Sequence, residues 1–375
     1  MSSTGDARDP RKKMTRILAS SVTWIRDFIS LPYSNIPIVV NFTKMTLFID
    51  QLPFRMHKQR FVLTNANKRR GILAVLILLL HLGIILKWVL DQWLNPVNHS
   101  RTIWKFVLMY YCVTVFCTIM VFIAQLTLLK EETISLLNLA LQIERDSSAK
   151  GFDIVHFYYV GFIAICKMAF ILMPMICLAF GLLRPCMPPV WSSVIYLECD
   201  SWDADGNTGF IFRIWGALLL LYLGAGIVST GLFDAAVVLI YPTEMLTDLH
   251  NSVFRHPIMS ILIGAVTICE CFALYTVIIS SSVVPIPVAI LFSTVAVDLL
   301  VTIVGPFKVM ANPFIKSVEL LQSLKRMNGS RWIKRFVRSC PPSKVTLGNG
   351  KFFDKATSLV ICSMCADLLI TFLLM

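Results

Sequence analysis

Charged side chains are scarce in this chain. Only 15% of its 375 residues are Asp, Glu, Lys or Arg, whereas 57% are hydrophobic. A soluble globular domain has about a quarter of its residues charged and about half apolar. The composition therefore excludes that class and is typical of a polytopic membrane protein.

Motifs for catalysis are also missing. No His, Ser and acidic residues stand at the spacing of a catalytic site, and Gly348–Gly350 is a turn rather than a phosphate-binding loop. The pairs Cys269/Cys271 and Cys362/Cys365 have some metal-like spacing, but no histidine accompanies them in the same apolar run. The sequence predicts no enzyme, no cofactor and no metal site.

Seven apolar runs are long enough to cross a bilayer. A hydrocarbon core of roughly 30 Å requires about 20 helical residues. The predicted spans are Gly71–Leu94, Ile103–Leu129, His156–Leu183, Gly209–Tyr241, Met259–Ser282, Val284–Val309 and Ala356–Met375. We therefore predict an all-α membrane protein with seven transmembrane helices. The fourth run has 33 residues, so its helix must tilt or project beyond the membrane.

Positive charge divides unevenly between the two sides of this arrangement. Of the 34 Lys and Arg residues, 28 fall before span one, after span six or in the connections on the same side. Because such residues are retained on the cytoplasmic side, the N-terminus is predicted inside and the C-terminus outside. The net charge of +12 then belongs to the inner membrane surface, where anionic lipid attracts it, and requires no nucleic acid.

Two features fit the outer side. Asn98-His99-Ser100 is a glycosylation sequon in the first outer loop, which makes Asn98 a candidate for glycosylation. Cys186 and Cys199 share the second outer loop, where an oxidising environment permits a disulfide between them or leaves both free.

Two polar regions flank the first six spans. The N-terminal region lacks the uninterrupted apolar core of a signal peptide, so we expect it to remain in the mature protein. Within this region, the moderately apolar segment Ile36–Phe54 predicts an interfacial or re-entrant helix, or else a loop. Pro313–Arg326 has amphipathic helical spacing. The predicted organisation is a cytoplasmic region at 1–70, a six-helix ligand-binding bundle at 71–309, a cytoplasmic amphipathic anchor at 310–355 and a seventh helix at 356–375.

Ionisable residues inside the spans are costly unless they face protein or water. Lys167, Asp234, Glu270 and Asp298 are expected to pair within the bundle, for instance Lys167 with Glu270 or Asp298. In the last span, Ser363, Asp367 and Thr371 repeat every four residues and form a polar stripe. That stripe faces either a pore or the neighbouring spans.

The arrangement resembles the gustatory and odorant receptor superfamily of arthropods. The likeness covers the predicted topology of the whole chain. Similarity of local sequence is concentrated before the last span, in the basic stretch and glycine of Arg335–Gly348 and in the aromatic pair Phe352-Phe353. Thr357 matches the Thr-Tyr…Gln-Phe motif of gustatory members. Three other positions of that motif differ here: Ser358, Met364 and Cys365.

This resemblance implies a chemosensory receptor of the plasma membrane that acts as a ligand-gated, non-selective cation channel. It implies a homotetramer or a heterotetramer with related subunits, in which Ser363, Asp367 and Thr371 line the pore. A small-molecule tastant or odorant would bind between the outer halves of spans two to six. The candidate pocket residues are the aromatic side chains there: Tyr110, Phe180, Trp215, Tyr222, Tyr275 and Phe292.

Three alternatives remain open at this point. A G-protein-coupled receptor also has seven spans, but the charge distribution predicts the inverted topology. A secondary transporter would show paired internal repeats, which this sequence lacks. The third alternative is a non-conducting membrane protein of the same fold.

Overall fold

The structure is a computed structural model. It describes residues 42–49, 51–58, 60–64, 68–94, 103–146, 154–191, 193, 209–240, 251, 253, 257–279, 284–326, 335, 339–348 and 351–374. Within these residues, seven helices are long and apolar enough to cross a membrane. The predicted class of a helical, polytopic membrane protein is therefore confirmed.

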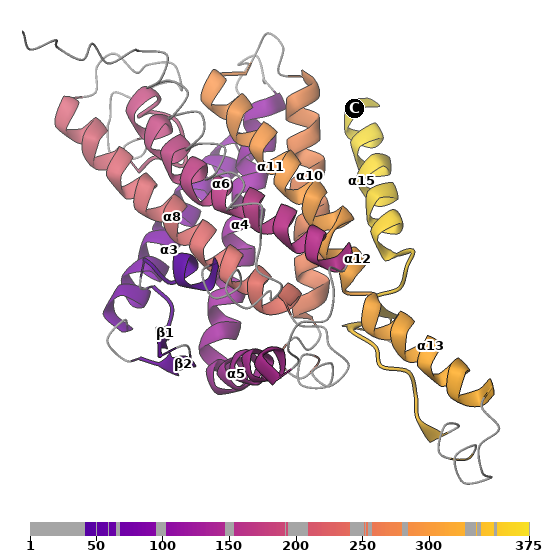
Figure 1. Ribbon diagram of the computed structural model, residues 1–375. Coiled ribbons are helices and arrows are strands. Elements are labelled where there is room, and N and C mark those ends of the chain that lie inside the picture. The colour runs from indigo at the N-terminus through magenta and orange to yellow at the C-terminus, as the bar shows by residue number, and fades with distance from the viewer. Residues whose placement is uncertain are drawn as a thin grey trace, which may run out of the picture.

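The seven helices follow the predicted spans closely. They are α3 (Lys68–Leu94), α4 (Ile103–Leu128), α6 (Ile154–Leu183), α8 (Phe210–Ile240), α10 (Ile258–Ile279), α11 (Ile286–Val304) and α15 (Thr357–Leu374). The fourth, α8, has 31 residues and runs obliquely across the bundle, as its length requires (Figure 1).

The sixth predicted span is divided, which corrects the expectation of one helix over Val284–Val309. Helix α11 ends at Val304, and the short helix α12 (Pro306–Val309) and then α13 (Asn312–Arg326) follow. Pro306 has no backbone N–H to continue the hydrogen bonds of α11. Helix α13 confirms the amphipathic helix predicted after the sixth span.

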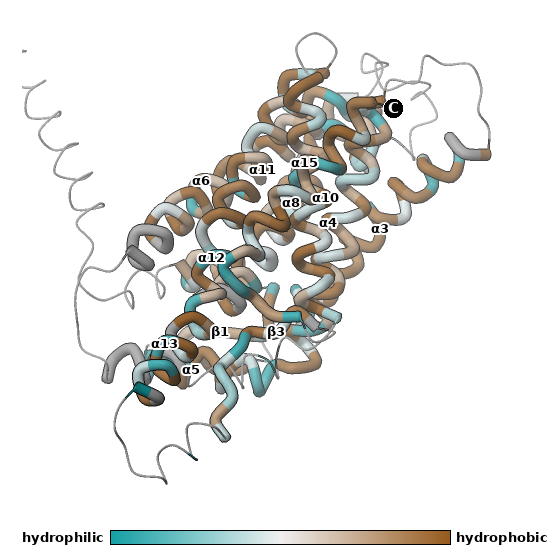
Figure 2. The backbone as a smooth tube through the Cα atoms, turned by 90° about the vertical axis from the view of Figure 1, so that its right-hand side faces the viewer, coloured by the Kyte–Doolittle hydropathy of each residue, from teal (hydrophilic) through white to brown (hydrophobic). Residues whose placement is uncertain are grey.

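The elements sort to two ends of the bundle (Figure 1). Helix α5 (Lys130–Asp146), helix α13 and the hairpin of β1 (Phe54–His57) and β2 (Arg60–Leu63) lie at one end, which we call the hairpin end. Helix α15 finishes at the opposite end, which we call the C-terminal end. Hydrophobic residues cover the spans, and hydrophilic ones gather on α5 and α13 (Figure 2).

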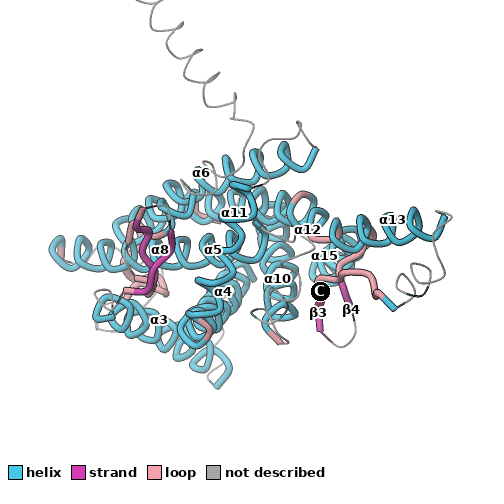
Figure 3. Tube along the Cα trace, turned by 60° about the horizontal axis from the view of Figure 1, so that its bottom comes forward, coloured by secondary structure: helices cyan, strands magenta, loops and turns pink. Residues whose placement is uncertain are grey.

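Helices α3 and α15 lie on opposite sides of the bundle, with α4, α6, α8, α10 and α11 between them (Figures 1 and 3). The close approach of α6 to α8 requires a glycine, because a Cβ on Gly181 would overlap Ala217. Small residues allow transmembrane helices to pack in this way.

Two hydrophobic cores hold the bundle. The core at the hairpin end contains stacked Phe54 and Phe233, with ring centroids 5.2 Å apart, and buried Phe307 and Phe353. The core at the C-terminal end includes Met109, Phe180 and Phe292. Several spans contribute to both cores, so the two ends are parts of one packed bundle.

The segment before β1 is inserted among the spans. Residues 42–46 are helical, and Phe42, Thr43 and Thr46 are buried. The ring of Phe42 meets Phe162 of α6 edge-on at 6.5 Å, and the Ser229 hydroxyl of α8 donates to the Thr46 carbonyl. Residues 42–46 are therefore a buried helix rather than a plain loop.

A side-chain amide fastens the β1–β2 hairpin to α5. The Asn138 amide of α5 donates to the Phe61 carbonyl at 3.0 Å and accepts from the Phe61 N–H at 2.9 Å. The hairpin and α5 therefore form one layer across that end of the bundle.

Candidate functional site

Helix α15 packs against the bundle with one face only. Ile361 and Cys365 are buried, and the Cys365 thiol donates to the Thr267 carbonyl of α10 at 3.8 Å. Further along, Phe372 meets the rings of Phe272 and Tyr275 on α10, with centroids 5.7 and 6.1 Å apart. These contacts fix which face of α15 is turned away from its own chain.

The predicted polar stripe lies on the face turned away. Ser363, Asp367 and Thr371 are all exposed. At 100° per residue, Ser363 and Asp367 lie roughly opposite Cys365 and Phe372, and Thr371 lies at the edge of the exposed face. The Thr371 hydroxyl donates to the backbone carbonyl of Asp367 at 2.8 Å, and the Asp367 side chain is exposed. Apolar side chains flank the stripe and are exposed too: Val360, Met364, Ile370 and Leu374.

The segment before α15 anchors the start of that helix. Phe353 is fully buried against Phe307, and Lys344 lies 4.3 Å above the ring of Phe352. Asp354 accepts hydrogen bonds from the Ala356 N–H and the Thr357 hydroxyl, at 3.1 and 2.7 Å. The aromatic pair singled out in the sequence is thus the attachment of α15 to the hairpin-end core.

A cavity of about 250 Å³, which we call the central cavity, lies between α4, α6, α8, α10 and α11 and opens to the surface of the bundle. Small side chains leave this space open, among them Ala169, Gly231, Ala235 and Ala265. The lining is mostly apolar, and Asp298 is its acidic member.

A second cavity of about 120 Å³, which we call the outer cavity, adjoins the first toward the C-terminal end. The two cavities share Tyr111, Val115, Met173, Ile227 and Val228. Tyr111 is held between them by an edge-on contact with Phe292, whose ring centroid is 5.0 Å away. The sequence reading missed Tyr111, which lies next to the candidate Tyr110 in sequence but on a different face of α4.

The six predicted pocket residues do not come together. Phe180 lines the outer cavity, whereas Tyr275 and Phe292 are buried in helix packing and line neither cavity. Tyr110 and Trp215 are 36% and 56% exposed and lie on the outer surface of the bundle. The expectation of one shared aromatic pocket is therefore corrected.

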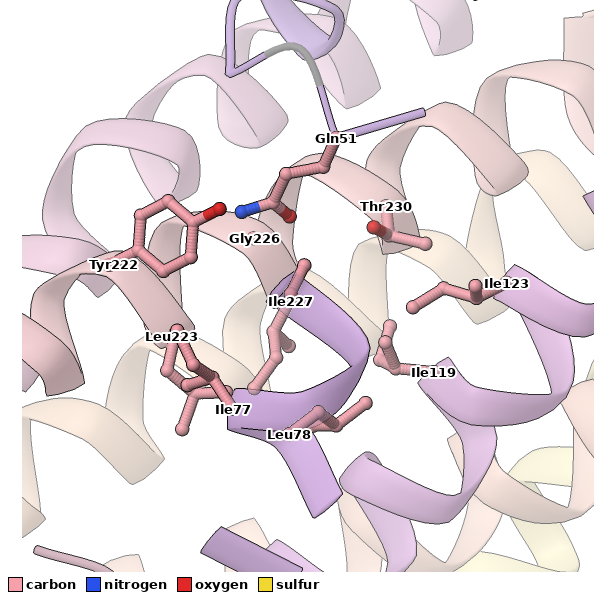
Figure 4. Close-up of a pocket in the computed structure, with 11 residues that line it drawn as sticks. Gln51, Ile77, Leu78, Ile119, Ile123, Tyr222, Leu223, Gly226, Ile227 and Thr230 are labelled. Atoms are coloured by element: carbon pink, nitrogen blue, oxygen red, sulfur yellow. The ribbon is translucent and has the colours of Figure 1, made fainter. Parts of the chain in front are cut away.

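The sixth residue, Tyr222, belongs to a different site, where the N-terminal segment meets α8. The Gln51 amide lies beside Gly226, between the hydroxyl of Tyr222 and Thr230 (Figure 4). A Cβ at Gly226 would overlap Oε1 of Gln51, so a larger residue here would displace the Gln51 amide. Among the described residues, the buried Nε2 atom of Gln51 has no hydrogen-bond partner.

Two of the ionisable residues inside the bundle, Asp234 and Glu270, do not pair as expected. Asp234 and Glu270 are 0% and 1% exposed, and none of their carboxylate oxygens has a hydrogen-bond partner among the described residues. The predicted pairing is therefore wrong for Asp234 and Glu270. Asp298 differs from both because it lines the central cavity.

Of the residues predicted to form a disulfide or to carry a glycan, Cys186 lies within the described part of the chain. Cys186 is disulfide-bonded, and Cys199, its expected partner, lies outside the described residues. Asn98, the candidate for glycosylation, also lies outside them. Across the described ranges, no group of three His, Cys, Asp or Glu side chains could hold a metal ion.

No protein-family model matches this chain, and no curated protein matches it significantly. The geometry of α15 and of the cavities is therefore the basis on which a function can be inferred.

Proposed function

We propose that this chain is a subunit of an oligomeric, ligand-gated cation channel of the gustatory and odorant receptor type. Helix α15 lines the pore, and a small molecule that binds within the bundle opens it. The observation that carries the proposal is the exposed polar stripe of Ser363, Asp367 and Thr371 on a membrane-spanning helix.

Lipid is a poor environment for this stripe. An Asp at the centre of a spanning helix costs about 2.5 to 3.5 kcal/mol on insertion scales. Asp367 lies near the middle of α15, on the face opposite its contacts with α10. Water or a neighbouring subunit removes that cost, and a symmetric assembly around α15 provides both.

A ring of Asp367 carboxylates explains cation selectivity. Copies of α15 arranged about one axis with their stripes inward would bring one carboxylate from each subunit to the same level of the pore. Acidic rings concentrate cations and exclude anions in channels of this kind. The exposed apolar residues Val360 and Leu374 would lie above and below the ring, where hydrophobic constrictions gate by excluding water.

Helix α10 connects the cavities to the pore helix. One face of α10 contributes Ala265, Val266 and Cys269 to the central cavity. Another face carries Thr267, Phe272 and Tyr275, the residues that contact α15. A ligand that shifts α10 would therefore displace α15 as well.

The proposed setting is the plasma membrane, with the N-terminus and the hairpin end in the cytoplasm. Arg55, Arg60 and Lys130 lie at the hairpin end, and the described part of the connection before α15 adds Arg326 of α13. Positive residues favour the cytoplasmic side. Surface staining of an epitope at the C-terminus, but not at the N-terminus, of intact cells tests this orientation.

Single-channel recording of the purified protein in planar bilayers, under a panel of small molecules, tests the channel. Asp367→Asn should lower unitary cation conductance severalfold and weaken selectivity against anions, because the ring loses its charge. The matched control is Asp91→Asn, which removes an exposed carboxylate on α3, on the far side of the bundle. Unchanged conductance and selectivity in Asp367→Asn would exclude α15 as the pore lining.

A further inference from the structure

The central cavity combines one acidic side chain with three aromatic rings. Asp298 enters its lining from α11, Tyr111 and Phe122 from α4, and Phe162 from α6. Most of the remaining lining is aliphatic, and it also includes Thr118, Thr302, Cys166 and Cys269. An anionic group facing aromatic surfaces across an apolar space is the chemistry that recognises an organic cation.

The carboxylate of Asp298 has no partner within the described part of the chain. The two threonine hydroxyls of the lining bond to the backbone: Thr302 donates to the Asp298 carbonyl at 2.8 Å, and Thr118 donates to the Thr114 carbonyl at 2.7 Å. Tyr111 and Cys166 also line the cavity. No described Lys or Arg lines the cavity. A charged or polar group in such a place is costly until a partner arrives.

Asp298 is half-buried and has free space beside it, whereas Asp234 and Glu270 are fully buried. Asp234 and Glu270 are enclosed by protein and line neither the central nor the outer cavity. Asp298 faces about 250 Å³ of open volume. Of these three groups, it is therefore the one that a bound molecule can reach without moving the backbone.

We infer that the central cavity binds a small apolar amine in its protonated form. The ammonium group contacts the Asp298 carboxylate, and the apolar body packs against Tyr111, Phe122 and Phe162, where cation–π attraction adds to apolar burial. The volume lies near the lower end of the range for ligand pockets, so the amine is small. This inference names the ligand class for the proposed receptor and depends on that function only for what binding does.

Equilibrium binding to the purified chain in lipid nanodiscs tests it without any current. The probes are cyclohexylamine, 2-phenylethylamine and 4-phenylbutylamine, with 2-phenylethanol as the neutral counterpart and empty nanodiscs as the blank. Saturation-transfer NMR reports binding. We expect at least one amine to bind roughly tenfold or more tightly than the alcohol, and Asp298→Asn to remove that preference.

Two further variants separate the carboxylate from the cavity. Asp234→Asn makes the same chemical change in a buried carboxylate outside the cavity and should leave amine binding unchanged. Ala265→Leu narrows the cavity with the carboxylate intact and should weaken binding of the larger amines first. If Asp298→Asn fails to fold, the amine-to-alcohol preference of the natural chain and the effect of Ala265→Leu decide the question.

The inference is overturned if no amine binds at millimolar concentration, or if the alcohol binds as well as the amines. It is also overturned if Asp298→Asn binds amines as the natural chain does. Amine binding that depends on Asp298, in a protein that passes no current, would support the site and exclude the channel. The two proposals therefore fail separately.

Discussion

Helices α10 and α15 are both apolar, both long enough to cross a membrane and in contact with each other, yet they differ in how they meet their surroundings. Half of the most apolar stretch of α10 is buried, against 17% of that of α15. The acidic residue of α10, Glu270, is enclosed, whereas that of α15, Asp367, is exposed. The exposed polar face of α15 is where the proposed channel would place its pore and the neighbouring subunits.

The largest expected effect is a difference in the free energy of unfolding that is lost when a side chain is truncated on the more buried helix and on the less buried one. Phe272→Ala on α10 removes a ring from the core at the C-terminal end and should cost about 3 to 5 kcal/mol. Leu359→Ala on α15, where the side chain is 72% exposed, should change stability by less than about 0.5 kcal/mol. Thermal unfolding in a detergent that keeps the chain monomeric measures both, and equal losses would contradict the comparison.

A smaller effect concerns water on the two faces of α15. In a Cys362→Ala background, Ser363→Cys should react quickly with a membrane-impermeant, water-soluble thiol reagent, because Ser363 lies on the exposed stripe. Cys365, two residues away on the buried face, is the internal control and should stay unmodified. Mass spectrometry of the protein labelled in nanodiscs gives both extents. A slow Ser363→Cys thiol would indicate that lipid, not water, covers the stripe.

Helical span lengths and the stripe on α15 could be predicted because both depend on local pattern. An apolar run of about 20 residues sets a span, and a spacing of four residues sets a face. The break at Gly305-Pro306 was missed because the apolar run continues through it into α12, and hydropathy does not register a missing N–H donor.

The cavities could not be predicted by searching for aromatic residues. A cavity forms where facing side chains are small, and the central one is bordered by Ala169, Gly231 and Ala265 from three different helices. Their meeting depends on how α6, α8 and α10 pack, which no local pattern encodes. The large rings of Tyr275 and Phe292 fill space instead, and so lie in helix packing rather than in a pocket.

An experimental structure of the purified protein in lipid nanodiscs, by electron cryomicroscopy, tests the central claim most directly. The account predicts a symmetric assembly in which α15 from each subunit surrounds the axis, with Ser363, Asp367 and Thr371 facing a water-filled path. A monomer, or an assembly in which α15 meets lipid at the periphery while other helices form the centre, would contradict it.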